Sequence, residues 1–143
     1  MKNDLTLLTC GLGKVYNNPQ YLITMFFMTF IKQDPKKKLQ LCLITIVLIG
    51  FIKIIKKLFQ TDRPCSFQNN HPCCPSNYDI PSMHSALGVF HGILLFKAGY
   101  KKISYFFFMQ PILRILGNQH SLLAVIIGTI IGTIIGYSFT KYC

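Results

Sequence analysis

The sequence predicts an all-α protein, a polytopic membrane helical bundle of about five transmembrane helices. Hydrophobic residues make up 51% of the 143 positions, and the charged residues stand in short groups between long uncharged runs. Only four residues are acidic, against 15 lysines and arginines, which leaves little anionic surface to solvate a soluble globule. Five apolar runs in a chain long enough for one domain therefore favour helices that lie in a membrane.

The five runs differ in length. The last, Ser121–Thr140, is the clearest, because about twenty uncharged residues cross the hydrocarbon core of a bilayer. The four shorter runs are Tyr21–Ile31, Leu39–Ile52, Met83–Phe96 and Ile103–Leu113. We expect residues 1–19 to be a polar lead-in without a cleavable signal peptide, and residues 20–143 to form the membrane-embedded domain.

Prolines and glycines shape the segments between and within these runs. Pro35, beside three lysines, predicts a short inner loop, and Pro111 predicts a kink in the fourth helix. The outer loop over residues 59–81 is interrupted by prolines that forbid a long helix, namely Pro64, Pro72, Pro75 and Pro81. The last run carries a stripe of glycines that we interpret as internal packing of the bundle: Gly128, Gly132 and Gly136.

The net charge of +11 does not predict nucleic acid binding, because the basic residues follow the helix ends. If the helices alternate in direction, most lysines reach one side: Lys32, Lys36, Lys37, Lys38, Lys97, Lys101, Lys102 and Lys141. The positive-inside rule makes this side cytoplasmic. The outer loop and the turn at His120 then lie on the lumenal or extracytoplasmic face.

The outer loop also holds three of the six cysteines, Cys65, Cys73 and Cys74. An oxidising compartment would permit disulfides there, and free thiols are the alternative. His71 stands beside them, but the spacing matches no zinc site, so we predict no metal.

Basic residues border the outer loop in a pattern that suits phosphate. Lys56 ends the second run, where a lysine usually extends to the lipid headgroups. Arg63 follows in the loop and changes this interpretation, because its guanidinium offers a planar fork of donors for phosphate oxygens. Ser82 is a good N-cap for the third helix, whose first-turn N–H groups form an anion site. His84 lies in that first turn, and His91, two turns deeper, is expected to be a packed core histidine.

Arg114 and His120 complete the set. Arg114 closes the fourth run inside an apolar stretch, where a charge is costly unless it faces protein or a polar cavity. His120 follows a short turn and precedes the last helix. Two histidines and two arginines from three loops at one face predict a site that holds a phosphate group and breaks its ester or anhydride bond.

Three blocks in this order resemble the type 2 phosphatidic acid phosphatase superfamily, whose signature is Lys-x6-Arg-Pro, Pro-Ser-x-His and Ser-Arg-x5-His-x3-Asp. The matching residues are Lys56, Arg63, Pro64, Pro81, Ser82, His84, Arg114 and His120. The resemblance spans about residues 39–137. Arg63-Pro64-Cys65 and the stretch Tyr78–Ser85 are also similar to dolichyl and polyprenyl diphosphatases.

The resemblance implies a phosphatase that needs no cofactor or metal. His120 would be the nucleophile that forms a phosphohistidine, and His84 would protonate the leaving oxygen and later activate water. Lys56, Arg63 and Arg114, with N–H groups near Ser82, would stabilise the phosphoryl oxygens.

The chain departs from the family pattern at three positions. Met83 replaces a usually small residue, and Leu113 replaces the serine before the arginine. Ala124 replaces the aspartate that in the family orients the nucleophilic histidine. The dolichyl diphosphatase branch also lacks that aspartate, so Asp62, Asp79 or a backbone carbonyl is the candidate to hold the imidazole.

The sequence thus favours an integral membrane phosphatase acting on a lipid phosphate or polyprenyl diphosphate, with membrane lipids as its surroundings. Two alternatives are a weak or inactive family member that binds anionic lipid, and a small helical membrane pore or scaffold.

Overall fold

The computed structural model describes residues 34–64 and 78–142, and all regular elements in these two ranges are helices. They are α3 (Pro35–Phe59), α4 (Met83–Lys97), α5 (Lys101–Phe108), α6 (Gln110–Leu116) and α7 (Leu122–Tyr142). The predicted all-α class is therefore confirmed. The polar lead-in, the run Tyr21–Ile31 and the cysteines of the outer loop lie outside the described residues.

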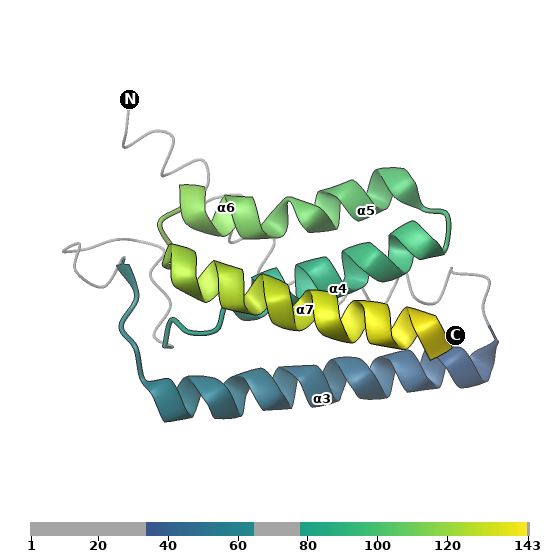
Figure 1. The fold of residues 1–143 in the computed structure, drawn as a ribbon, viewed down its shortest axis with the longest axis horizontal. Helices are drawn as coiled ribbons and strands as arrows, with labels where there is room; N and C mark the ends of the chain where they lie inside the picture. Colours follow the sequence, from purple (N-terminus) through teal and green to yellow (C-terminus); the bar gives the residue numbers. More distant parts are fainter. Residues whose placement is uncertain (1–33, 65–77, 143) are drawn as a thin grey trace.

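The helices lie roughly along one common direction, so that successive segments run back and forth between two ends of the molecule (Figure 1). Helix α4 occupies the centre and contacts α3, α5, α6 and α7. At one end α3 and α6 finish while α4 and α7 begin (Figure 1). This arrangement brings together the three sequence blocks that were predicted to share a face.

Helix α3 is the longest element, with 25 residues. Asp34 caps its start by accepting a hydrogen bond from the N–H of Lys36, and Pro35 fits the first turn, where no N–H partner is needed. Gln60 ends it in a left-handed conformation with φ of 45°. Its outward face exposes large apolar side chains: Leu39, Leu43, Ile46, Val47, Phe51, Ile54 and Leu58. Such a face suits contact with lipid rather than water.

Helix α4 packs tightly against α7 because glycines remove side chains from the contact. A Cβ atom added at Gly128 would collide with the carbonyl oxygen of Ser82, and one at Gly132 would collide with that of Ala86. Only a glycine allows backbones to approach this closely. The glycine stripe is thus used inside the bundle, as the sequence indicated.

The fourth apolar run is divided into α5 and α6 at Met109, just before Gln110 and Pro111. Proline cannot donate the hydrogen bond that would continue the first helix, and its ring crowds the preceding turn. The predicted interruption is therefore confirmed. The two short helices follow one another along the same side of the bundle (Figure 1).

Two helices of the described residues, α3 and α7, are long and apolar enough to cross a membrane. Helix α7 covers the predicted run Ser121–Thr140 except for Ser121, which directly precedes the helix. Helix α4 has 15 residues and is almost entirely enclosed by its neighbours. The described residues thus show two helices able to cross a membrane, and a bundle of five such helices stays a prediction.

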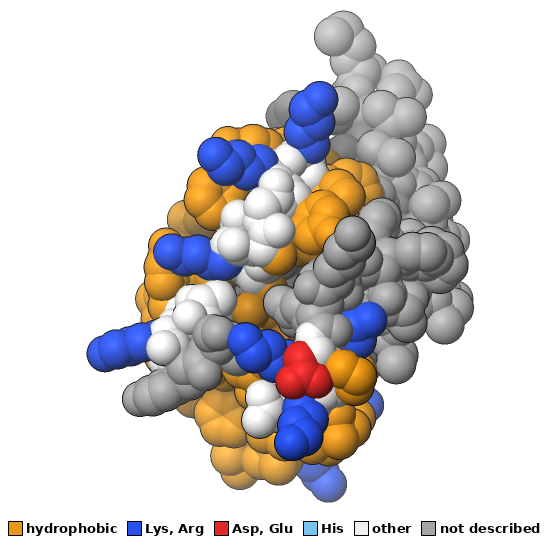
Figure 2. Space-filling view, turned by 90° about the vertical axis from the view of Figure 1, so that its right-hand side faces the viewer, with side chains coloured by type: hydrophobic (Ala, Val, Ile, Leu, Met, Phe, Trp, Pro, Cys, Tyr) orange, Lys and Arg blue, Asp and Glu red, His pale blue; other side chains and the backbone are white. Residues whose placement is uncertain are grey.

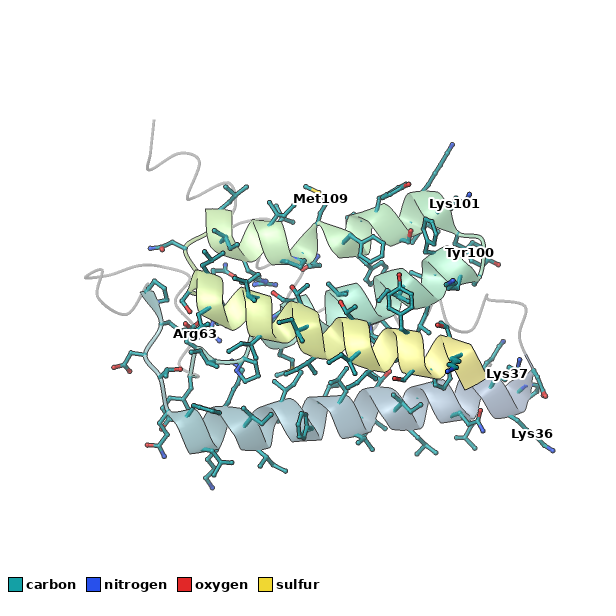
Figure 3. The ribbon with its side chains drawn as sticks, viewed as in Figure 1. Lys36, Lys37, Arg63, Tyr100, Lys101 and Met109 are labelled. Carbon is teal, nitrogen blue, oxygen red and sulfur yellow. The ribbon has the colours of Figure 1, made fainter. Side chains whose placement is uncertain are left out.

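The end of the bundle opposite the site is rich in lysine. Figure 2 looks onto this end and shows separate basic side chains around it. They come from the start of α3, from the region around the α4–α5 turn and from the end of α7: Lys36, Lys37, Lys38, Lys97, Lys101, Lys102 and Lys141. The same end carries Tyr100, and Arg63 lies at the other end (Figure 3).

Candidate active site

All six predicted site residues reach the end of the bundle where α4 and α7 begin. Lys56 stands in the last turn of α3, and Arg114 stands in the last turn of α6. Ser82 is the N-cap of α4 and His84 lies in its first turn, while His120 comes just before α7. Burial, together with the positive charges of Arg114, Arg63 and Lys56, lowers the pKa of His84 well below its usual value, so these groups lie close together. The structure therefore gathers the three sequence blocks into one cluster.

The two described ends of the outer loop pair with each other at the site. Asp79 donates its N–H to the carbonyl of Thr61 over 2.8 Å, and Ile80 donates its N–H to the Thr61 hydroxyl over 3.1 Å. These bonds fix the segment that leads into Ser82 against the segment that leads to Arg63.

Lys56 strengthens this junction instead of extending to the headgroups. Its Nζ donates to the carbonyl of Tyr78 over 2.6 Å and to that of Asp79 over 3.2 Å. The side chain is only 5% exposed, so its positive charge is held inside the site. A buried ammonium that is paired with carbonyl oxygens keeps an electrostatic role in a low-dielectric environment.

Gln119 joins the two arginines, and sequence reasoning did not single it out. Its carbonyl accepts a hydrogen bond from Arg63 Nη1 over 2.8 Å, and its side-chain Oε1 accepts one from Arg114 Nη1. It is 2% exposed. The sequence did offer a signal for Gln119, because it is an amide between two apolar runs and directly precedes the candidate nucleophile.

His120 is held at both ring nitrogens. Its Nδ1 lies 2.6 Å from Asp79 Oδ1, and its Nε2 lies 3.0 Å from Arg63 Nη1. Arginine can only donate, so Nε2 must offer its lone pair, and the proton must stand on Nδ1, where the carboxylate accepts it. The arrangement fixes a neutral imidazole whose Nε2 can act as a nucleophile.

The charges in the site agree with this tautomer. Burial alone would raise the pKa of Asp79, but hydrogen bonds from His120 and Ser121 outweigh burial and hold the pKa below its usual value. Burial, together with the positive charges of Arg63 and Lys56, lowers the pKa of His120 to about 4 even though Asp79 opposes the shift. The imidazole is therefore neutral, and the carboxylate ionised, at neutral pH.

Arg63 remains a cation under the same conditions. Burial lowers its pKa to about 10, and the nearby Asp79 carboxylate limits the shift. The site therefore presents buried positive charge beside an uncharged nucleophile, which is the combination that attracts and then attacks a phosphate group.

Ser82 forms the cap that the sequence predicted. Its hydroxyl accepts hydrogen bonds from the N–H of Ser85 over 3.4 Å and from the Ser85 hydroxyl over 2.9 Å. Its own N–H donates to the carbonyl of Ala124 over 2.9 Å. These contacts tie the start of α4 to α7, and a direct role of Ser82 in phosphate binding stays a prediction. His84, two residues further on in the first turn of α4, keeps part of its surface accessible.

His91 lies outside this cluster, in the packed interior. Its Nε2 is 3.4 Å from the hydroxyl of Thr45 on α3, and its ring packs against Phe90 and Phe107. It is the core histidine that the sequence predicted. Within residues 34–64 and 78–142, no three histidine, cysteine or acidic side chains gather as ligands for a metal ion.

A family model described as the PAP2 superfamily matches residues 37–143 of the chain. This range contains every residue of the cluster and all five described helices except the first two residues of α3. No curated protein matches the chain, and no solved structure matches it.

Proposed function

Because the chain belongs to the PAP2 superfamily, we propose that it is a membrane phosphatase that hydrolyses a lipid phosphate or polyprenyl diphosphate through a phosphohistidine. The superfamily generally comprises phosphatases that act on lipid phosphates, and two helices of this chain are apolar enough to cross a membrane. The choice of lipid, the histidine intermediate and the independence from metal are our proposal.

The observation that carries the proposal is the state of His120. Its Nε2 bears the lone pair and stands beside Arg63, while Asp79 accepts the proton of Nδ1. A phosphate group that enters this cluster would meet a correctly oriented neutral nucleophile and at least three buried cations. Phosphoryl transfer depends mostly on such positioning and on electrostatic stabilisation.

In the first step, the phosphate takes the place of the His120 lone pair as the partner of Arg63. His120 Nε2 then forms a bond to phosphorus, and the bond from phosphorus to the leaving oxygen breaks. Burial and the surrounding cations keep His84 neutral before substrate binds, so it takes up a proton when the anionic phosphate enters beside it. His84 then donates this proton to the leaving oxygen, which departs as a lipid alcohol or, from a diphosphate, as a lipid monophosphate. Lys56, Arg63 and Arg114 stabilise the equatorial oxygens in the transition state.

In the second step, the now neutral His84 takes a proton from water. The oxygen of that water attacks phosphorus, the bond between nitrogen and phosphorus breaks, and inorganic phosphate leaves. His120 regains its lone pair and His84 regains its proton, so both groups are ready for another cycle.

A lipid substrate suits the surroundings of the site. Apolar side chains beside the cluster, at the end of α6 and the start of α7, are exposed: Ile115, Leu116, Leu122 and Leu123. An acyl or prenyl tail could remain among them in the bilayer while its phosphate reaches the buried cations. The lysine-rich opposite end supports an orientation with the site on the lumenal or extracytoplasmic face.

Phosphate release tests the proposal. Detergent-purified protein is incubated in EDTA with a polyprenyl diphosphate and, separately, with phosphatidate, beside His120→Ala and the control Asp62→Asn. Asp62 is an exposed residue of the outer loop. We expect release by the native protein and by the control only. No release from either substrate by folded native protein would instead support the alternative of an inactive family member.

A further inference from the structure

We propose that Asp79 is the positioning residue of His120, and that it occupies the place of the aspartate that the family pattern puts at position 124. The role rests on the proposed function of His120 as nucleophile. The sequence left Asp62, Asp79 or a backbone carbonyl to hold the imidazole, and the partner of Nδ1 in the structure is the Asp79 carboxylate. Asp62 is exposed, whereas the Asp79 carboxylate lies 2.6 Å from His120 Nδ1.

The start of α7 shows what an acidic residue at position 124 would do. Ser121 precedes the helix, and its hydroxyl accepts a hydrogen bond from the N–H of Ala124 over 3.2 Å. This is half of a capping box, in which a side chain at the third helical position returns to the N–H of the cap residue. Ala124 has no polar side chain, so it cannot complete the motif.

Asp79 completes it from a different part of the chain. Its Oδ2 and Oδ1 lie 3.2 Å and 3.3 Å from the N–H of Ser121, and Oδ1 also accepts the proton of His120 Nδ1. One carboxylate thus caps α7 and orients the nucleophile. The negative charge at a helix N-terminus is favourable in addition.

The position of Asp79 is itself tightly determined. Its backbone N–H is bound by Thr61, its carbonyl is bound by Lys56, and the residue is 1% exposed. Ala124 is fully buried, and its carbonyl accepts the N–H of Ser82, so the segment that follows Asp79 runs directly against α7 at this point. The carboxylate therefore reaches the imidazole from a segment that packs against α7 at the level of Ala124.

If Asp79 takes the role of an aspartate at position 124, substitutions at positions 79 and 124 should affect kcat in a coupled way. Asp79→Asn removes the negative charge. The asparagine oxygen keeps the N–H of Ser121 as its donor, so its amide group faces Nδ1, favours a proton on Nε2 and displaces Arg63 from that nitrogen. In the serine protease triad this change costs about 10⁴-fold in turnover. We expect a loss of kcat on the order of 10³-fold or more here. Adding Ala124→Asp to Asp79→Asn returns a carboxylate to the imidazole. We expect kcat of this double variant to be at least about tenfold higher than kcat of Asp79→Asn.

The same substitution in the native background should act in the opposite direction. With Asp79 present, Ala124→Asp would place two carboxylates around one N–H group, and like charges that close disfavour each other. We therefore expect Ala124→Asp alone to lower kcat while it raises kcat in the Asp79→Asn background. Two residues that act independently would show the same fold-change in both backgrounds.

The test compares kcat of the native protein, Asp79→Asn, Ala124→Asp, the double variant and the control Asp62→Asn, at matched thermal unfolding temperatures. ¹⁵N NMR of labelled histidine, assigned with His120→Gln, reports the His120 tautomer without any need for activity. A proton on Nδ1 in the native protein that moves to Nε2 in Asp79→Asn supports the proposal.

Three results would overturn it: an unchanged His120 tautomer in Asp79→Asn, a kcat within about threefold of native in that variant, or no recovery in an equally stable double variant. If the native protein released no phosphate, the proposed function would fail, while the NMR signals would still decide whether Asp79 positions His120.

Discussion

At the scale of single residues, the site holds buried cations whose hydrogen-bond acceptors are backbone carbonyls, the Gln119 amide and the neutral His120 imidazole. Arg63 donates hydrogen bonds to His120 Nε2 and to the Gln119 carbonyl. Lys56 donates hydrogen bonds to the carbonyls of Tyr78 and Asp79. Such a network keeps the cations in place without substrate, so that little reorganisation is needed when a phosphate replaces their partners.

Gln119 should support activity indirectly, because it holds the side chains of both arginines. Gln119→Ala removes the Oε1 acceptor of Arg114 and leaves a buried guanidinium with fewer partners, a loss of about 1–3 kcal/mol. We expect kcat/KM to fall by roughly tenfold or more, measured as phosphate release in detergent. Gln40→Ala, at an exposed position of α3, is the control. Equal activity of both variants would show that Arg114 does not depend on Gln119.

The acid limb of the pH profile should reflect His120. Burial and nearby cations lower the pKa of His120 to about 4, so the neutral nucleophile persists well below pH 6.5 and is lost only as the pH falls through about 4. Arg63→Gln removes one of those cations. The pKa should then rise toward 6.5, and the acid limb of kcat/KM should move to higher pH.

The same substrate is used for all variants in this measurement, so that its own ionisation cancels. Lys101→Gln, at the other end of the molecule, is the control and should leave the limb in place. If the acid limb of kcat/KM lay at the same pH in Arg63→Gln and in the native protein, a group other than His120 would control the reaction at low pH.

At the scale of elements, the contact between α4 and α7 positions the site, because both helices begin at it. Gly132→Ala would place a methyl group against the Ala86 carbonyl and force the helices apart, which should cost about 1–3 kcal/mol. Gly50→Ala is the matched control, since nothing lies within 4 Å of its added Cβ. Alanine there should be neutral or stabilising by up to about 1 kcal/mol.

Thermal unfolding in detergent, followed by circular dichroism, compares the two glycine variants. We expect a lower midpoint for Gly132→Ala and an unchanged or higher one for Gly50→Ala. A similar midpoint for both would mean that α4 and α7 tolerate a wider separation than their packing indicates.

At the scale of the whole molecule, the site and the lysine-rich end lie at opposite ends of the bundle, which predicts an orientation in the membrane. In a cysteine-free background, Asp62→Cys and Lys101→Cys are treated with an impermeant maleimide in sealed vesicles that keep the lumenal face outside. We expect labelling of Asp62→Cys alone until the vesicles are opened. Labelling of Lys101→Cys alone would reverse the orientation.

Much of this organisation could be predicted from the sequence, because its signals are local. The uncharged run before Thr140 predicted α7, Pro111 predicted the division between α5 and α6, and the glycine stripe predicted close packing. The alternating direction of the helices then implied that the three basic blocks meet at one end. Each of these inferences needs only spacing and residue type.

The partners within the site could not be predicted in the same way. Whether Asp62 or Asp79 holds His120 depends on how the two ends of the outer loop pair through Thr61. Gln119 gains its role only because its carbonyl and side chain face different arginines. These contacts join residues far apart in the chain, and no periodicity in the sequence encodes them.

The most direct test of the central claim is to trap the phosphorylated enzyme. Native protein is mixed with a polyprenyl diphosphate labelled with ³²P at its terminal phosphate, quenched in alkali and mapped by mass spectrometry. We predict an acid-labile phosphate on His120 that is absent from His120→Asn and that, once formed, decays more slowly in His84→Asn, where water is no longer activated. Phosphate release without this intermediate, or label on another residue, would contradict the account.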